Sequence, residues 1–460
     1  MPAPRSVAST TPPQYHRRTR RSSIAPTDPS APAVVSPPGE NTASSANAGE
    51  VGTIAAADPI SRGDAADAAR LVSLDVFRGL TIAAMILVNN PGTWAHIYWP
   101  LQHAPWNGWT PTDLVFPFFL FIVGVAMVFS FGARLGRGAT PAQLARHVLW
   151  RSAVIFAVGL FLHGFPYFRF ATIRIPGVLQ RIAVCYLCAA LIVLAARRRS
   201  LARPATARDA APIAAVIFVL LVGYWALMSF VPVPGYGAGN LTPQGNLAAY
   251  IDRALLSGHL WSQTHTWDPE GLLSTLPAIA TVLIGVLVGD WIRSARAPQL
   301  KAYGLFFAGG ACLVLGKLLD PIFPINKNLW TSSYVILTGG FAMVLLAGLY
   351  WLVELRGWRR WAKPFVVFGT NALFVFALSG LLAKSMGLIK ITVERAPACP
   401  PDCADPAVLR QISLHSYIYN RFFAPLAAPE NASLLFALCF VLFFLALNWL
   451  LYRRRVFIKI

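Results

Sequence analysis

Charged side chains are scarce in this chain of 460 residues: they make up 13% of it, whereas hydrophobic residues make up 56%. A mean hydropathy of +0.55 is too high for an ordinary soluble domain. Apolar runs recur along the chain, and runs of about 18–20 residues are long enough to cross a hydrocarbon layer roughly 30 Å thick. We therefore predict an all-α polytopic membrane protein.

Acidic residues are scarcer than basic ones, with 19 Asp and Glu against 39 Lys and Arg and a net charge of +20. In a soluble protein this excess would suggest a nucleic-acid partner. In a membrane protein, basic loops on the cytoplasmic side explain it better. We therefore expect membrane lipids, and no nucleic acid, around this chain.

Cysteine is also rare, with six residues and no disulfide framework. Four lie in apolar segments, where we interpret them as small buried side chains: Cys185, Cys188, Cys312 and Cys439. The other two, Cys399 and Cys403, form C-P-P-D-C in a polar loop and can pair if that loop faces an oxidising compartment. No second Cys or His pair accompanies them, so we predict no metal site.

Several sequence motifs are missing as well. The chain has no P-loop, no G-x-G-x-x-G after a strand, no H-E-x-x-H and no D-x-D-x-D loop. Nucleotide hydrolysis, a dinucleotide-binding fold and a zinc protease therefore have no support in the sequence.

The sequence divides into two parts. Residues 1–70 are rich in Pro, Ser, Ala and Thr and nearly free of aromatic residues, so we predict a disordered, basic cytoplasmic tail. The run R-R-T-R-R at residues 17–21 resembles a twin-arginine signal, but no apolar core follows it before residue 71, which argues against a cleaved signal peptide. Residues 71–460 are predicted to form one transmembrane domain.

About ten transmembrane helices are predicted in that domain. We place them at approximately residues 72–90, 112–132, 148–164, 177–196, 212–231, 272–292, 302–319, 331–352, 364–384 and 433–452. The loops after the second, fourth, sixth and eighth helices are rich in Arg and Lys, and so is the end of the chain. Since such loops stay in the cytoplasm, we expect an inner-membrane protein with both termini cytoplasmic.

The loop between the first two helices is the main candidate for chemistry, because it is polar, rich in Trp and free of Lys and Arg. His103 can transfer a proton near neutral pH or accept an acyl group. Trp106 and Asn107, close by, are candidates for substrate binding, since an indole can stack on a sugar ring. The alternative is an interfacial histidine in an aromatic belt, bonded to a backbone carbonyl.

Two more polar residues border this loop. Asn89 lies about 25 Å along the first helix, at the same membrane boundary as His103, where it can orient the imidazole or bind a carbonyl oxygen. Asp113 opens the second helix, which is typical of a capping or first-turn acid. That role is compatible with a second one, holding the His103 ring.

A second cluster is predicted at the cytoplasmic face. Asp75 and Arg78 lie three residues apart on one helix face, where they form either a structural ion pair or a ligand site. An arginine there can hold a phosphate. Asn371, about 10 Å into the ninth helix from the same side, is a further candidate for this site.

Other polar residues interrupt the apolar runs near the outer face. They are Arg181, Asp268, Glu270, Asn326 and Lys327. Each alone is more often a cap, a turn or a helix–helix contact. Together they predict a substrate-binding mouth near His103, and the clusters at opposite faces suggest a path through the bundle.

Several motifs occur in order along residues 71–455. They are S-L-D-V-F-R-G-L at 73–80, V-N-N-P-G at 88–92, H-A-P-W-N-G-W-T-P-T-D-L-V-F-P-F-F-L-F-I-V-G at 103–124, R-I-P-G-V-L-Q-R-I-A at 174–183, W-D-P-E-G-L at 267–272, N-K-N-L-W-T-S-S-Y at 326–334 and G-T-N-A-L at 369–373. This set resembles the heparan-α-glucosaminide N-acetyltransferase family of transmembrane acyltransferases. The resemblance implies transfer of acetyl from cytosolic acetyl-CoA to an amino sugar or glycan across the membrane, with His103 as the active-site histidine and Asn89 as its neighbouring asparagine.

A different class of function fits the same polar residues. A transporter or flippase for a glycan or lipid intermediate would move its substrate without making bonds. The chain has no obvious internal repeat, which counts weakly against a transporter, and the resemblance favours the enzyme. The sequence leaves open whether His103 is acetylated or acts as a general base, and whether the protein forms a homo-oligomer.

Overall fold

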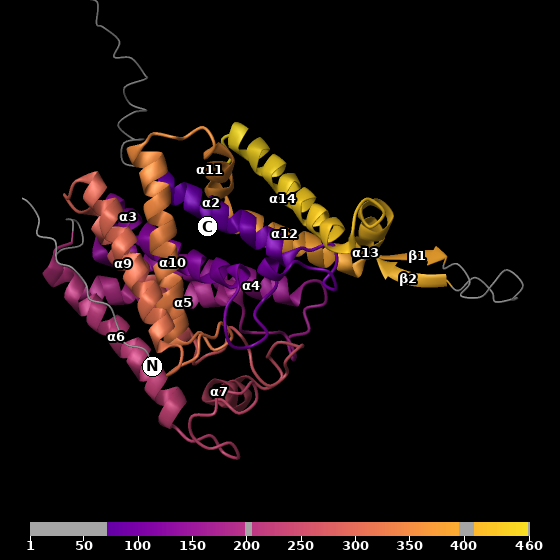
Figure 1. The fold of residues 1–460 in the computed structure, drawn as a ribbon, viewed down its shortest axis with the longest axis horizontal. Helices are drawn as coiled ribbons and strands as arrows, with labels where there is room; N and C mark the ends of the chain where they lie inside the picture. The colour runs from indigo at the N-terminus through magenta and orange to yellow at the C-terminus, as the bar shows by residue number, and fades with distance from the viewer. Residues whose placement is uncertain (1–70, 198–204, 395–408, 459–460) are drawn as a thin grey trace, which may run out of the picture. The chain divides into compact units, whose positions relative to one another are not determined.

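The computed structural model describes residues 71–197, 205–394 and 409–458, and these are mainly helical (Figure 1). Within them, nine helices are long and apolar enough to cross a membrane, and one bent helix pair makes a tenth candidate. This confirms the predicted all-α polytopic fold. The predicted tail of residues 1–70 and the pair Cys399 and Cys403 lie outside the described residues.

The helices follow the predicted order. The straight candidate spans are α2 (Val72–Asn89), α3 (Val115–Leu135), α4 (Pro141–Gly164), α5 (Val178–Ala196), α6 (Ala207–Phe230), α8 (Thr275–Arg293), α9 (Pro298–Leu319), α10 (Ser332–Tyr350, extended by a π-helical turn, Trp351–Leu355) and α14 (Pro429–Arg453). The bent pair is α11 (Lys363–Thr370) and α12 (Ala372–Leu388). Shorter elements are the 3-10 turns η1 (Trp99–Leu101) and η2 (Pro111–Leu114), the helices α7 (Leu247–Leu256) and α13 (Leu414–Ile418), and an antiparallel hairpin of β1 (Lys390–Glu394) and β2 (Leu409–Ser413).

The spans differ in how deeply they are buried. The most apolar window of α8 is 72% buried and that of α3 is 67% buried, against 22% for α6 and α9. Figure 1 shows α13 and α14 at one edge of the bundle and α6 and α7 at the opposite edge. Of the four cysteines expected in the core, only Cys185 is buried; Cys439 is exposed because its face of α14 points out of the bundle.

The ninth predicted helix is not continuous, and this corrects the expectation for Asn371. The chain bends by 80° between α11 and α12, and Asn371 lies at the break instead of inside a helix. Its amide donates to Val456 O at 3.2 Å and accepts from Ile458 N at 2.8 Å. Asn371 therefore holds the segment after α14, a contact that no local helix pattern reveals.

Glycines allow the central helices to touch. A Cβ atom at Gly124 of α3 would lie 1.9 Å from the carbonyl oxygen of Val282 in α8, and one at Gly285 would lie 2.1 Å from that of Phe121. Such contacts between small residues bring helix backbones together in membranes.

We expect Gly124→Ala to lower the free energy of unfolding by about 1–3 kcal/mol, because the added methyl group must push α3 and α8 apart. Thermal unfolding of the detergent-purified protein measures this. Gly310→Ala on α9 is the matched control, since a Cβ there meets nothing within 4 Å. Equal loss in both variants would contradict the close packing of α3 on α8.

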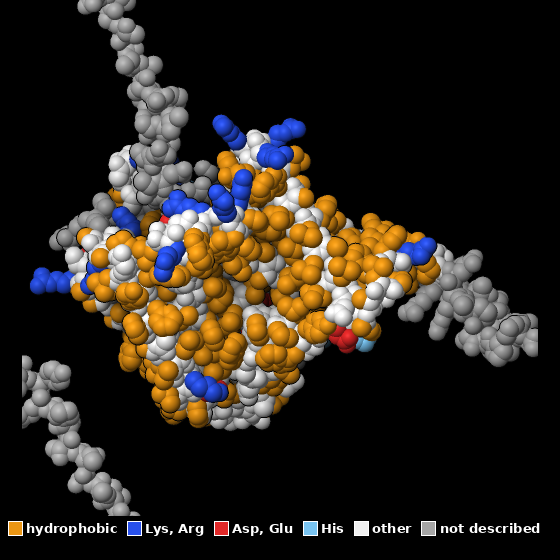
Figure 2. All heavy atoms as spheres, turned by 45° about the horizontal axis from the view of Figure 1, so that its top comes forward, with side chains coloured by type: hydrophobic (Ala, Val, Ile, Leu, Met, Phe, Trp, Pro, Cys, Tyr) orange, Lys and Arg blue, Asp and Glu red, His pale blue; other side chains and the backbone are white. Residues whose placement is uncertain are grey.

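Basic side chains gather at one end of the bundle. α3, α8 and α14 all finish with an arginine in the last turn: Arg134, Arg293 and Arg453. Figure 2 shows Lys and Arg side chains concentrated along the upper edge of the face that it draws. We call this the basic end, and the opposite end, which holds η1, η2 and α7, the loop end.

Candidate active site

His103 and Asp113 lie in contact at the loop end. The ring atom Nδ1 of His103 is 2.7 Å from Asp113 Oδ1. An ionised carboxylate only accepts, so Nδ1 carries the proton and donates it, which leaves a lone pair on Nε2. The His103 side chain is 46% exposed, whereas that of Asp113 is 1% exposed. A buried acid thus fixes the orientation of an accessible imidazole.

Local sequence explains why Asp113 is so well placed. It is the third residue of a capping box that opens η2, and it accepts from Thr110 N at 3.0 Å. Asp113 Oδ2 also accepts from Ala104 N at 3.0 Å, next to the histidine. The Asp113 backbone oxygen accepts from Tyr334 OH of α10 at 2.5 Å. The capping acid expected from the sequence is therefore also the acid that holds His103.

Lys327 completes the group. Its Nζ lies 2.9 Å from His103 Nδ1, 3.3 Å from His103 Nε2 and 3.3 Å from Asp113 Oδ1. Burial lowers the pKa of Lys327, while the charges of Asp113 and Glu270 limit the shift. Because Nδ1 already donates to Asp113, the ammonium does not donate to it; it shares the Asp113 carboxylate with the ring and lies within reach of the Nε2 lone pair.

The loop of His103 is tied to the loop of Lys327 by backbone and amide contacts. Gly108 N donates to Ile325 O at 2.7 Å, with Gly108 in the left-handed region at φ +93°. Asn326 Nδ2 donates to Asn107 Oδ1 at 3.1 Å, and Asn326 Oδ1 accepts from Leu329 N. Asn107 and Asn326, both predicted to bind substrate, hold the two loops in register.

A cavity of about 440 Å³ opens at the basic end. Its charged and polar lining includes Arg78, Arg134, His147, Arg151 and Thr370. Its apolar lining reaches Phe119, in the second turn of α3 from the loop end. Between Arg134 and Phe119 the helix rises about 22 Å, so the cavity extends through most of the bundle toward the His103 side.

Comparisons with known proteins show the family of this chain. Residues 70–234, which include His103 and Asp113, match the family model described as heparan-alpha-glucosaminide N-acetyltransferase, catalytic. The chain belongs to this family. It is 32% identical to human heparan-alpha-glucosaminide N-acetyltransferase over 352 residues, or 67% of this chain and 52% of the human protein. It is 33% identical to the mouse protein of the same name over 376 residues, or 71% and 56% of the two chains. The chain thus spans about half the length of these relatives.

Of the residues predicted near the basic end of this family member, Arg78 lines the cavity. Its Nη1 lies 3.0 Å from Asp75 Oδ1 and 3.4 Å from Gly369 O, so the predicted pair with Asp75 exists and faces the α11–α12 break. Asn371 binds the segment after α14, as described above. Its neighbours Gly369 and Thr370 line the cavity.

Asn89 stands apart from the histidine. It is the last residue of α2 and is exposed, and no hydrogen bond in the described part of the chain joins it to His103. The next residue, Asn90, is buried and donates to Ile86 O at 2.7 Å. The role predicted for Asn89 therefore remains a prediction.

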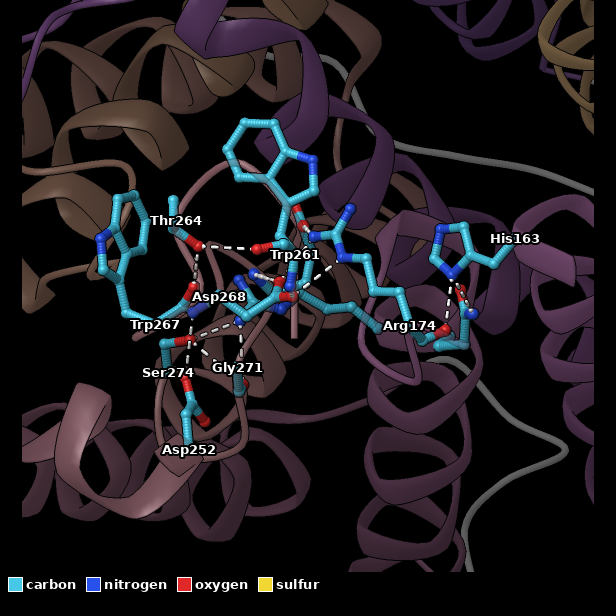
Figure 3. A network of polar contacts seen from close by, with 12 residues as sticks. His163, Arg174, Asp252, Trp261, Thr264, Trp267, Asp268, Gly271 and Ser274 are labelled. Carbon is cyan, nitrogen blue, oxygen red and sulfur yellow. Dashed lines mark hydrogen bonds and ion pairs between the residues drawn. The ribbon is translucent and has the colours of Figure 1, made fainter. Parts of the chain in front are cut away.

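Asp268 and Glu270, predicted at the outer mouth, bind an arginine that the sequence analysis did not select. Arg174 donates to Asp268 at 2.8 and 2.6 Å and to Glu270 Oε2 at 2.5 Å (Figure 3). Burial would lower the pKa of Arg174, but the two carboxylates raise it. Asp268 also accepts from Trp261 N at 3.1 Å, so this network fixes the loop before α8.

Trp106, for which stacking on a sugar remains a prediction, packs against a second tryptophan. The ring of Trp106 meets that of Trp267 edge to face, with centroids 5.1 Å apart, and its Nε1 donates to Leu241 O at 3.0 Å. Trp106 thus connects the His103 loop with the loops on either side of α7.

Three cavity residues were also missed: Arg134, His147 and Arg151. Arg134 and Arg151 belong to the Arg-rich segment after the second predicted helix, which was used to place that side in the cytoplasm. The charge of such a segment does not show which of its arginines face solvent and which face a cavity. Arg151 differs from the others in its position, because it lies well inside α4 (Pro141–Gly164). An arginine well inside a membrane helix is a candidate functional residue.

Proposed function

We propose that this protein is a transmembrane acetyltransferase that moves an acetyl group from acetyl-CoA to an amine or hydroxyl of an amino sugar or glycan. The donor binds in the cavity at the basic end, and the acceptor meets the acetyl group at His103. The observation that supports this most is the cavity itself, which leads from three arginines toward the side of the bundle that holds the histidine.

The chemistry of the cavity suits this donor. Coenzyme A has phosphates at one end, a long and mostly uncharged arm, and a thioester at the other. Arg78, Arg134 and Arg151 offer charge-assisted hydrogen bonds to phosphate. The lining beyond them is largely apolar, from α3, α5 and α12, and suits the arm.

At the loop end, two routes to transfer fit the geometry. In one, His103 Nε2 attacks the thioester carbonyl, CoA leaves as the thiolate, and the acceptor removes the acetyl group from the imidazole. In the other, His103 takes the proton of the acceptor while the acceptor attacks the thioester directly. In both, Asp113 keeps the imidazole in the tautomer whose Nε2 carries a lone pair and no proton.

The charge distribution supports a direction for the reaction. Basic ends of helical membrane proteins face the cytoplasm. With the basic end inside, acetyl-CoA enters from the cytosol and the acceptor lies on the far side of an inner membrane, with the chain after α14 cytoplasmic.

The test is release of free CoA. Purified protein in detergent or liposomes, given acetyl-CoA and glucosamine or a cell-wall amino sugar, should release CoA in proportion to acetylated sugar. A transporter or flippase would release none, and that result would contradict the proposed function.

Donor binding gives a separate prediction. Arg151 Nε is buried without a hydrogen-bond partner, and its guanidinium lies 5.3 Å above the Tyr186 ring at the cavity wall. We expect Arg151→Gln to raise the KM for acetyl-CoA about 10–100-fold, since one charge-assisted hydrogen bond is worth about 1.5–3 kcal/mol. Arg137→Gln is the control, because Arg137 is exposed and only donates to Ala133 O. An unchanged KM in Arg151→Gln would place the phosphates elsewhere.

A further inference from the structure

Arg181, in the first turn of α5, is a buried cation with unused hydrogen-bonding capacity. It is 2% exposed. Its Nη2 donates to Gly271 O at 3.1 Å and to Ser274 Oγ, while Nε and Nη1 have no partner. Within the described residues no carboxylate lies at ion-pair distance from it. A charge in the interior of a membrane domain is costly unless it is paired, which makes Arg181 a candidate ligand-binding group.

Arg197, the other arginine buried among the described residues, is paired differently. Arg197 donates from Nη1 to Asp290 Oδ1 at 2.6 Å and from Nη2 to Asp290 Oδ2. Asp252 interacts with Arg181 electrostatically but makes no hydrogen bond to it. Its two carboxylate oxygens accept hydrogen bonds from Leu272 N and Asp268 N. Figure 3 shows Asp252 beside Gly271 and Ser274. Two guanidinium nitrogens of Arg181, Nε and Nη1, therefore have their N–H groups free for an oxygen ligand.

Arg181 is the chain neighbour of a residue that lines the donor cavity. The residue after it, Ile182, lines the cavity. Phe119 of α3 also lines the cavity, and Phe116 lies one helical turn before it. The guanidinium of Arg181 lies 5.1 Å over the ring of Trp330, and Phe116 meets the same ring at 5.0 Å. The Trp330 ring thus contacts Arg181, the residue before Ile182, and Phe116, one helical turn before Phe119.

Trp330 also joins Arg181 to the His103 site. Its backbone N donates to Lys327 O at 3.1 Å, and Lys327 Nζ lies against His103. Trp330 is 1% exposed and has φ +54°, the left-handed region that a bulky side chain rarely adopts. Strain of this kind gathers at sites that must move or bind. The indole therefore contacts the Arg181 guanidinium on one side, and its backbone is bonded to the residue that lies against His103.

We propose that Arg181 binds the carbonyl oxygen of the acyl thioester and stabilises the negative charge that forms on it during transfer. This role rests on the proposed acetyltransferase function and concerns one step of the reaction, the attack on the thioester carbonyl. When His103 Nε2 or the acceptor attacks the carbonyl carbon, the C=O electron pair moves to oxygen, and the N–H groups of Arg181 hold it. When the C–S bond breaks, the pair returns and CoA leaves as the thiolate. The role is the same for both routes.

The test compares Arg181→Gln and Arg181→Lys with Arg197→Gln. We expect Arg181→Gln to lower kcat by about 10²–10³-fold, the effect of losing one oxyanion donor, with the KM for acetyl-CoA changed less than about threefold. Arg181→Lys should recover part of kcat because it keeps the charge. In the substrate-free protein, Arg181→Gln should unfold at the wild-type temperature or above, because it removes an unpaired buried charge, whereas Arg197→Gln should unfold at a lower temperature, because it leaves Asp290 unpaired.

The outcomes separate this inference from the proposed function. Wild-type kcat in Arg181→Gln, or a loss of thermal stability equal to that of Arg197→Gln, would overturn the role of Arg181 and leave the acetyltransferase proposal standing. Failure of the wild-type protein to release CoA with any amine would overturn the acetyltransferase proposal, and the role of Arg181 with it.

Discussion

Replacing His103 by alanine is expected to lower kcat for acetyl transfer by about 10²–10⁴-fold, the range for removing a general base, and to abolish transfer if the imidazole is acetylated. The reason is geometric: Asp113 holds Nδ1 at 2.7 Å, so Nε2 is the unprotonated atom that can attack or take a proton. Release of CoA from acetyl-CoA in the presence of an amino sugar measures the effect. The unfolding temperature should stay near the wild-type value, since the ring is half exposed.

His96→Ala is the matched control for that experiment. His96 lies in the same loop and is exposed, with Nδ1 3.5 Å from Glu430 Oε1, and has no contact with Asp113. Its replacement should leave transfer unchanged. If both variants keep full activity, the imidazole of His103 has no part in the reaction and the proposed site is wrong.

Labelled acetyl-CoA distinguishes the two routes. A label that stays on wild-type protein in the absence of acceptor, and is missing from His103→Ala, is expected for the acetyl-histidine route. Wild-type protein that turns over without ever becoming labelled would reject that route and leave His103 as a general base.

The membrane spans were predictable from the sequence because a bilayer demands long apolar helices with their backbone groups paired internally. Helix starts were less predictable. α4 begins at Pro141 and α6 at Ala207, five to seven residues earlier than their apolar runs indicated. In both, a polar capping box forms the first turn, with Thr140 and Gln143 in α4. Hydropathy does not detect such turns.

The site was predictable as a set of residues but not as a set of contacts. Asp113 is ten residues from His103 and belongs to the same loop, so its second role was within reach of sequence reasoning. Lys327 is 224 residues away, and only the packing of two distant loops brings it to the ring. Asn371 looked like a residue inside a helix because the flanking residues are apolar, yet its side chain binds backbone 85 and 87 residues further along the chain.

Arg174 was missed for a related reason. An arginine in a polar loop usually lies in solvent, and R-I-P-G gives no sign that two carboxylates almost a hundred residues away turn back to meet it. The structure makes it the centre of the network that holds the loop before α8.

We therefore expect Arg174→Met to lower the free energy of unfolding by about 3–5 kcal/mol, the usual cost of removing one partner of a buried ion pair. The side chain of Asp268 is fully buried and that of Glu270 is 10% exposed, so without the guanidinium two carboxylates lie close together away from water. The loss should shrink as the pH is lowered, because protons then neutralise the unpaired acids. Chemical unfolding of the detergent-solubilised protein, followed at several pH values, measures both effects.

Arg169→Met is the control for this variant, because Arg169 lies in the same loop but is exposed, and contacts the Tyr167 ring at 5.7 Å. A triple variant, Arg174→Met with Asp268→Asn and Glu270→Gln, removes all three charges and should recover much of the lost stability, since the cost comes from unpaired carboxylates and not from the missing arginine. If the triple variant is no more stable than Arg174→Met alone, the network acts through shape and hydrogen bonds instead of charge. In that case acidification should leave the instability of Arg174→Met unchanged as well, so the two measurements must agree.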